Sequence, residues 1–306
     1  MDTDGGAAGR GPREGETMAT WAELSCYTSN LAAYLAPGRP RLRFELADAV
    51  RLAVLPATTA LSHHDRVDGG SLGYRGAARW AEATAGMAAE LETNGSVLAV
   101  ANTHQMPWSP DYQRRATPHW VLLTGRPGGG WQVADHFAAT TPHGEHRPYH
   151  GQATEDELRA LLTPVGTVSD EVANRDRYAL GEPVEVPPPS QYRWLVRTAA
   201  VRTTARPGWL TGSDAVAHLA AMVEDRERLA ALTDDLWAAS RHQLFRHRVR
   251  SAAGLTDPEA TSAAVSAWEE LPRALRFAVE SAGRGRPRPG LVRAAFDRII
   301  TAGATA

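Results

Sequence analysis

Residues 119–136 carry the clearest structural signal in this sequence: His-Trp-Val-Leu-Leu-Thr-Gly-Arg-Pro-Gly-Gly-Gly-Trp-Gln-Val-Ala-Asp-His. Two runs that favour extended backbone, 119–124 and 131–136, flank a glycine-rich stretch. This arrangement is typical of two antiparallel strands joined by a loop. A phosphate-binding loop would need a helix after the glycines, so we interpret the stretch as a β-hairpin.

The hairpin predicts a pair between a histidine and a carboxylate. If Thr124 pairs with Gly130 across the loop, His119 lies directly opposite Asp135 on one face of the sheet. The same register makes two further pairs, Leu123 with Trp131 and Val121 with Val133. A shift by one residue would put His119 and Asp135 on opposite faces, so the predicted pair depends on the register.

The only cysteine, Cys26, stands at the start of a predicted helix over residues 26–35. A helix N-terminus favours the thiolate form of a cysteine, which is the nucleophilic form. A cysteine nucleophile also needs a base and a group that orients the base. His119 and Asp135 supply both, and the order cysteine, histidine, acid along the chain is the papain-like order.

The rest of the chain predicts an α+β region followed by helices. Further helices are expected over 44–55, 79–91 and 155–162, a strand over 96–101, and helical segments over 214–250, 259–283 and 291–300. A proline-rich stretch over 182–190 marks a domain boundary. We therefore predict a disordered tail over 1–18, a catalytic domain over 19–187 and a helical domain over 188–306.

Composition excludes several classes of protein. The chain has 306 residues and a net charge of -2, which argues against a general nucleic-acid-binding protein. No apolar run approaches the roughly 18 residues that span a membrane, and residues 1–18 lack the apolar core of a signal peptide. A cytoplasmic protein is the expectation. All 33 basic residues are arginine, which excludes Schiff-base, P-loop and Ser–Lys chemistry.

Several short motifs resemble one known family. Residues 25–35 look like the nucleophile helix of the butirosin biosynthesis H-protein family, N-terminal domain, whose members resemble papain-like and bacteriocin-processing peptidases. The other matching stretches are a strand with a following motif at 97–108, a histidine strand at 119–125, a third strand at 131–135 and a segment at 151–158. The resemblance extends over most of the chain from about residue 20.

The resemblance implies a papain-like cysteine-protease fold, in which a helix bearing the cysteine packs on an antiparallel sheet bearing the histidine and the acid. It also implies an acyltransferase, or amide synthase, of antibiotic biosynthesis. Cys26 would take an acyl group from a thioester on an acyl carrier protein or another donor, and His119 and Asp135 would assist transfer to a small-molecule amine. No cofactor is expected, because phosphopantetheine would arrive on the carrier protein.

The oxyanion donor departs from the papain-like pattern. The stretch 20–25 before the cysteine holds neither Gln nor Asn, so the backbone N–H of Cys26 would need a second donor from elsewhere. Gln105 and Asn102 are candidates for that donor, although Asn102 is equally suited to stabilising a turn. Two aromatic residues complete the candidate substrate contacts, Trp108 and Tyr27.

Two further clusters have a plainer interpretation. His143, His146 and His150 lie with Glu145 in a loop-like stretch whose spacing matches no helix-borne zinc motif, and we expect no metal site. The other cluster is formed by Arg241, Arg246, Arg248 and Arg250 on a predicted helix. These arginines form either a solvated face or a docking surface for an acidic carrier protein.

Two alternatives to the acyltransferase stay open. A cysteine hydrolase of the same fold, whether a peptidase, an amidase or a thioesterase, needs the same triad with water as acceptor. A non-catalytic binding protein on a degenerate papain-like fold would keep Cys26 as a small buried apolar residue. A homodimer is compatible with the long helical C-terminal region.

Overall fold

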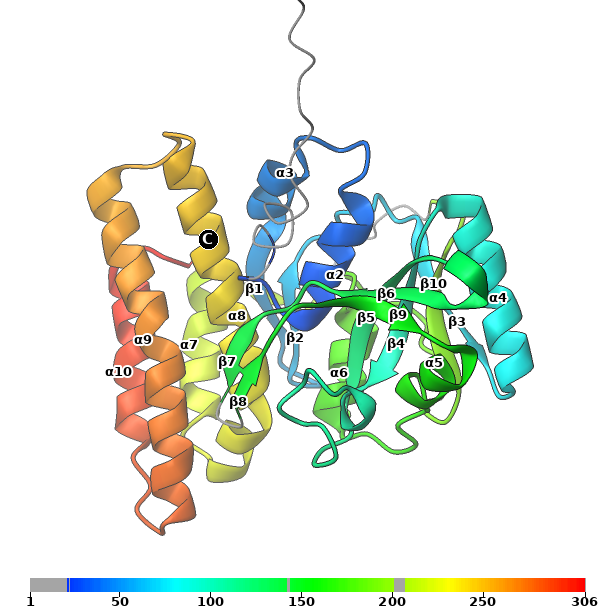
Figure 1. The fold of residues 1–306 in the computed structure, drawn as a ribbon. Coiled ribbons are helices and arrows are strands. Elements are labelled where there is room, and N and C mark those ends of the chain that lie inside the picture. The colour runs from blue at the N-terminus through cyan, green and yellow to red at the C-terminus, as the bar shows by residue number, and fades with distance from the viewer. Residues whose placement is uncertain (1–20, 22, 142–143, 201–206, 306) are drawn as a thin grey trace, which may run out of the picture.

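A computed structural model describes residues 21, 23–141, 144–200 and 207–305 (Figure 1). The tail predicted over 1–18 lies outside the described residues. The fold mixes helices with antiparallel sheets and ends in a helical region, so the expected α+β class is confirmed. In the described part of the chain, no helix combines the length and apolar character needed to cross a membrane.

The main sheet has six strands, and each neighbouring pair is antiparallel. Their order across the sheet is β3 (Leu72–Ala77), β10 (Tyr192–Arg197), β4 (Val97–Asn102), β5 (Pro118–Gly125), β6 (Trp131–Asp135) and β9 (Tyr149–Ala153).

Helices cover both faces of this sheet. Trp120 and Leu122 of β5 pack in one apolar cluster with α2 (Cys26–Leu35). The alternate residues Val121 and Leu123 pack in another with α4 (Trp80–Asn94) and α5 (Glu155–Leu161). Strand residues alternate between faces, so β5 is apolar on both sides and lies in the middle of the core.

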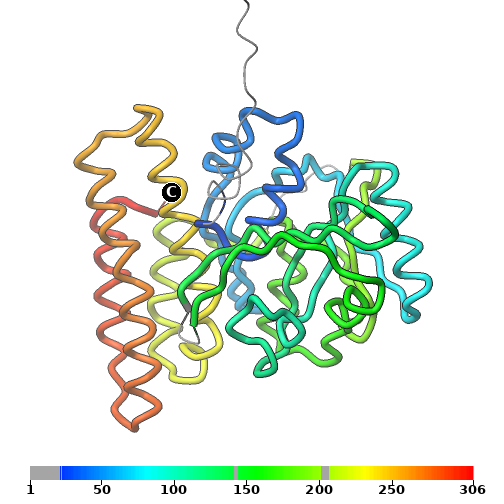
Figure 2. Tube along the Cα trace, viewed as in Figure 1, coloured from blue at the N-terminus to red at the C-terminus, as the bar shows by residue number. Residues whose placement is uncertain are grey.

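A second, smaller sheet connects the main sheet to the C-terminal helices. It has the order β11 (Leu210–Thr211), β1 (Val50–Leu55) and β2 (Ala60–His64). Its apolar side chains share a core with the last four helices, which lie side by side in Figures 1 and 2. These are α7 (Gly212–Met222), α8 (Arg226–Ala252), α9 (Pro258–Gly283) and α10 (Pro289–Thr301).

The remaining elements are short. They are α3 (Leu42–Ala49), α6 (Asp170–Tyr178), the hairpin of β7 (Ala139–Thr141) and β8 (Gly144–His146), and two 3₁₀ turns, η1 (Thr103–Gln105) and η2 (Pro127–Gly129).

The proline-rich stretch does not separate a sheet domain from a helical domain. Strand β10 lies beyond the predicted boundary at 187/188, yet it pairs with both β3 and β4 inside the main sheet. The prolines lie in the connection that brings the chain back to the sheet. Two helix predictions also need correction, because residues 50–55 of the helix predicted over 44–55 form a strand, and the helix predicted over 214–250 is interrupted at residues 223–225.

The hairpin has the predicted strands in a different register. Leu123 pairs with Val133, two residues beyond the Trp131 expected from the sequence, and Leu122 pairs with Ala134. The connection through the turn η2 is longer than predicted, so that Gly125 pairs with Gln132, and a bulge between Leu123 and Gly125 takes back one residue of the resulting shift. A shift by two residues leaves every side chain on its predicted face. His119 is therefore a diagonal neighbour of Asp135, where the sequence predicted a directly opposed one.

Candidate functional site

Cys26 is the first residue of α2, as the sequence predicted. The side chain of Ser25 caps the helix by accepting a hydrogen bond from the backbone N–H of Thr28. The thiol is free and half-buried. Backbone N–H groups in the first turn of a helix have no partner within the helix, so they are available to a negatively charged group near Cys26.

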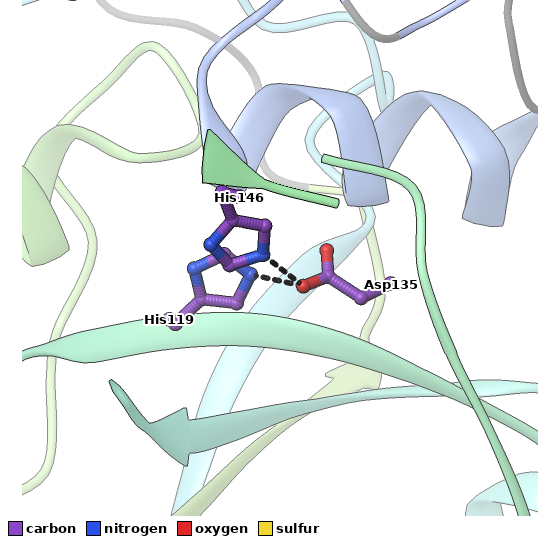
Figure 3. A group of neighbouring side chains, drawn as sticks. All are labelled: His119, Asp135 and His146. Atoms are coloured by element: carbon purple, nitrogen blue, oxygen red, sulfur yellow. Dashed lines mark hydrogen bonds and ion pairs between the residues drawn. The ribbon is translucent and has the colours of Figure 1, made fainter. Parts of the chain in front are cut away.

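His119 and Asp135 are in contact, which confirms the pair predicted from the hairpin. Nε2 of His119 lies 2.9 Å from Oδ2 of Asp135, and the two residues are 3% and 0% exposed (Figure 3). Because Nε2 is engaged by the carboxylate, Nδ1 is the ring nitrogen left to act on a thiol.

The charge on His119 is stabilised by its two neighbours. Burial alone would lower the pKa of His119, but the charge of Asp135, the charge of Cys26 and hydrogen bonds with both raise it to about 10. Cys26 and His119 also line one cavity. The thiol of Cys26 and a charged, carboxylate-bonded imidazole therefore face one space, which is the pairing that a cysteine nucleophile needs.

Asp135 is held by five N–H groups. Oδ2 accepts from the ring nitrogens of three residues, His119, His146 and Trp108, at 2.8–2.9 Å. Oδ1 accepts from the side chain of Asn30 and from the backbone of Phe137, each at 3.0 Å. Burial would raise the pKa of this carboxyl, but the charge of His119 and the hydrogen bonds lower it well below its usual range. Asp135 therefore stays ionised.

His146 is a site residue that sequence reasoning missed. It lies in β8, and its ring stacks on that of His119 with centroids 5.0 Å apart (Figure 3). The sequence groups it with a histidine cluster on a loop, but the other described members of that cluster have separate partners. His143 lies outside the described residues, His150 is exposed beside Gln132, and Glu145 pairs with Arg147.

The main cavity lies between the sheet and the C-terminal helices and measures about 680 Å³. One wall carries Cys26, His119 and His146, and the other is formed by α8 and α9. Apolar side chains of that second wall include Trp237, Leu275 and Val279. The C-terminal helices therefore form one wall of the cavity, and residues from the N-terminal part of the chain form the other.

Two further hollows adjoin the site. A small one of about 40 Å³ also touches Cys26 and is lined by polar residues such as His63 and the Arg175–Asp235 ion pair. A side cavity of about 350 Å³ lies beyond the β7–β8 hairpin, between Glu145, His146 and Arg241. His146 lines both the main and the side cavity.

The predicted oxyanion donors are occupied elsewhere or lie away from the main cavity. Asn102 donates to the carbonyl of Thr163 and accepts from the backbone N–H of His104, which is the turn-stabilising role. Gln105 lies in η1 and does not line the main cavity. Neither Asn102 nor Gln105 therefore lines the main cavity, where the sequence analysis expected a donor.

The two aromatic residues predicted to contact substrate, Trp108 and Tyr27, instead form hydrogen bonds with buried carboxylates. The indole N–H of Trp108 donates to Asp135, and its ring stacks on Tyr149 with centroids 3.9 Å apart. Tyr27 is buried, stacks on Trp120 and donates its hydroxyl to Asp176. Neither residue lines the main cavity.

The arginine cluster on α8 is bonded to its own chain. Arg241 donates to the carbonyl of Ala138, and burial lowers its pKa to about 10. The other three also have partners in this chain: Arg246 binds the carbonyl of Val50, Arg248 pairs with Glu23 and Glu269, and Arg250 pairs with Asp48. These contacts join α8 to the N-terminal part of the fold and, through Glu269, to α9.

In the described part of the chain, one group of buried side chains could ligate a metal ion, namely His119, Asp135 and His146. One ligand atom each from His119, Asp135 and His146 lie within 4.8 Å of one another. The carboxylate oxygen they would share already accepts the N–H of Trp108. Hydrogen bonds alone therefore account for the geometry of this group.

The sequence matches no protein-family model, and the search of curated proteins finds no relative. We therefore infer what the site can do from its geometry alone.

Proposed function

We propose that this protein is a cysteine-dependent acyltransferase with a papain-like arrangement of its catalytic residues. It would transfer an acyl group from a thioester, through an acyl-enzyme on Cys26, to an amine. One observation carries the proposal. A cysteine at the start of a helix lines the same cavity as His119, whose ring is bonded to the buried Asp135 on the antiparallel sheet.

In the first half-reaction, the Cys26 thiolate attacks the thioester carbonyl carbon. The tetrahedral intermediate carries its negative charge on oxygen, where the free backbone N–H groups at the start of α2 can donate to it. The carbon–sulfur bond of the donor then breaks. His119 gives its proton to the departing thiolate, which leaves as a thiol, and the acyl group stays on Cys26.

In the second half-reaction, an amine attacks the acyl-enzyme. The new carbon–nitrogen bond forms as the bond to Sγ breaks, and the amine loses one proton to a base in the site. Asp135 holds the imidazole of His119 in the required tautomer and stabilises its charged form. Amide formation requires that the amine reach the acyl carbon ahead of water, and the main cavity is walled on two sides.

The experiment is intact-mass spectrometry of the protein incubated with thioesters. The panel holds acetyl, hexanoyl and benzoyl thioesters of N-acetylcysteamine and an acylated carrier protein, with Cys26→Ala as the control. We expect a mass increase on the wild type alone, discharged by added butylamine to give an amide. Release only as the free acid would identify a hydrolase. Failure of iodoacetamide to modify Cys26 near neutral pH would remove the nucleophile altogether.

A further inference from the structure

His146 is bonded to Asp135 in the same way as His119. Its Nε2 lies 2.8 Å from Oδ2 of Asp135, and the corresponding distance for His119 is 2.9 Å. The two rings are nearly parallel, at 17°, and each meets the carboxylate with one edge (Figure 3). One carboxylate therefore orients two imidazoles.

The carboxylate also fixes the tautomer of His146. An ionised carboxylate only accepts hydrogen bonds, so Nε2 of His146 carries the hydrogen and Nδ1 keeps its lone pair. Among the described residues, Nδ1 of His146 has no hydrogen-bond partner, and the residue lines the main cavity. His146 thus keeps an unprotonated nitrogen and lines the same cavity as Cys26.

The two histidines differ in charge. The pKa of His146 is lowered by burial and by the charge of His119, against the opposing effects of Asp135 and Asp111. His119 takes up the proton because it lies between Asp135 and Cys26, and a second charge on the stacked ring is disfavoured. The site therefore holds an acid and a base side by side.

The position of His146 matches the approach of a second substrate. Cys26 lines the main cavity, which the acyl group would occupy, and it does not line the side cavity. His146 lines both cavities. An amine arriving through the side cavity would meet His146 before it met the acyl carbon.

We propose that His146 is a second catalytic base, which accepts the proton of the attacking amine in the second half-reaction. The inference rests on the proposed acyl transfer. The amine nitrogen bonds to the acyl carbon, its proton passes to Nδ1 of His146, and the bond to Sγ breaks. Cys26 leaves as the thiolate, and the proton moves from His146 to the now neutral His119 through water in the cavity, which restores the starting state.

The test separates the two half-reactions on an acyl-enzyme made with p-nitrophenyl acetate, a small activated ester that reports each acylation by release of p-nitrophenolate. Discharge of the acetyl group by butylamine is followed by intact mass. The informative variant is His146→Gln, because its side-chain amide can keep an N–H on Asp135 but offers no base. His146→Ala removes both functions, and His150→Gln alters an exposed histidine on β9 as a matched control.

We expect His146→Gln to be acylated within about threefold of the wild-type rate and to transfer to butylamine about 10² to 10⁴ times more slowly. His150→Gln should match the wild type in both steps. If His146→Gln transfers the acetyl group normally and only His146→Ala is slow, His146 merely positions Asp135. The proposal that His146 is a catalytic base would then be wrong. Equal losses in both steps would also overturn it.

Failure of the proposed function has a different signature. If the wild-type protein is not acetylated at Cys26 at all, the acyl-enzyme and the role of His146 fall together. If the wild type is acetylated and transfers to butylamine while His146→Gln does the same at full rate, the acyl transfer stands and only the second base is lost.

Discussion

Nδ2 of Asn30 donates a hydrogen bond of 3.0 Å to Oδ1 of Asp135 and so joins α2, the helix that begins at Cys26, to strand β6. The same nitrogen lies 3.0 Å from the carbonyl oxygen of Cys26 and 2.8 Å from that of Trp120. Asn30 is fully buried. Asn30 thus ties the first turn of α2 to the neighbouring strands β5 and β6.

Replacement of Asn30 should therefore cost stability. Asn30→Asp puts a second buried carboxylate against Asp135 and should lower the free energy of unfolding by about 3–5 kcal/mol. Asn30→Ala leaves acceptors unpaired and should cost about 1–3 kcal/mol. Urea denaturation measures both, with Asn94→Ala near the end of α4 as a control expected to stay within about 0.5 kcal/mol. An Asn30→Asp protein as stable as the wild type would contradict the contact.

Stability should fall on the alkaline side through His119. Its folded pKa is raised to about 10 from an ordinary 6.5, so its charge stabilises the fold fully below about pH 6.5 and the benefit is lost as the pH rises through 10. The pKa of Asp135 is lowered, so its charge stabilises the fold at pH values above the ordinary pKa of a carboxyl group. This stabilisation is lost as the pH falls into the acid range. Urea denaturation between pH 5.5 and 10 should show a decline that His119→Gln flattens. An identical decline in both proteins would exclude His119 as its source.

The N–H of Trp108 should matter for the reactivity of Cys26. Trp108→Phe keeps an aromatic ring against Tyr149 but removes one donor from Asp135, which should cost about 1.5–3 kcal/mol of stability and slow iodoacetamide alkylation several-fold. The matched control is Trp80→Phe, which removes an indole N–H from Glu155. It should leave the alkylation rate unchanged, and equal slowing by both would show an indirect effect.

Tyr27 should affect stability and leave substrate binding alone. Tyr27→Phe removes the hydroxyl bonded to buried Asp176 and should cost about 1–3 kcal/mol. The ring does not line the main cavity, so KM for the thioester should not change. Thermal denaturation and steady-state kinetics measure the two effects. A KM raised tenfold at unchanged stability would instead support the prediction that Tyr27 contacts the substrate.

Two glycines with positive φ should differ sharply on replacement by alanine. Gly181 has φ +90°, and an added Cβ would lie 2.4 Å from the carbonyl oxygen of His64. Gly95, at φ +74°, has open space there. Gly95→Ala should cost about 1 kcal/mol and Gly181→Ala more than about 3 kcal/mol in urea denaturation. Equal losses would mean that the approach to His64 is not tight.

The sequence was informative where local patterns decide the structure. The helix that begins at Cys26, the two strands of the hairpin and the contact of His119 with Asp135 are all confirmed. The exact register was wrong, because the length of the connection and the bulge near Gly125 depend on how the turn packs, and periodicity reports neither.

Features fixed by distant parts of the chain were missed. His146 reaches the site on β8, a strand of three residues whose own sequence does not show where the hairpin will lie. The residues 50–55 alternate weakly and were assigned to a helix, although pairing with β2 makes them a strand. Prolines near residue 187 suggested a boundary because local composition does not show that the following strand returns to the sheet.

The position of β10 also determines when the protein can assemble during synthesis. Residues 192–197 insert between strands that the ribosome completes about a hundred residues earlier. Until they emerge, β3 and β4 each expose an unpaired edge, which is the feature that draws partly folded chains into aggregates. A nascent chain halted at the proline-rich stretch would therefore carry Cys26, His119 and Asp135 and yet depend on chaperones for its solubility.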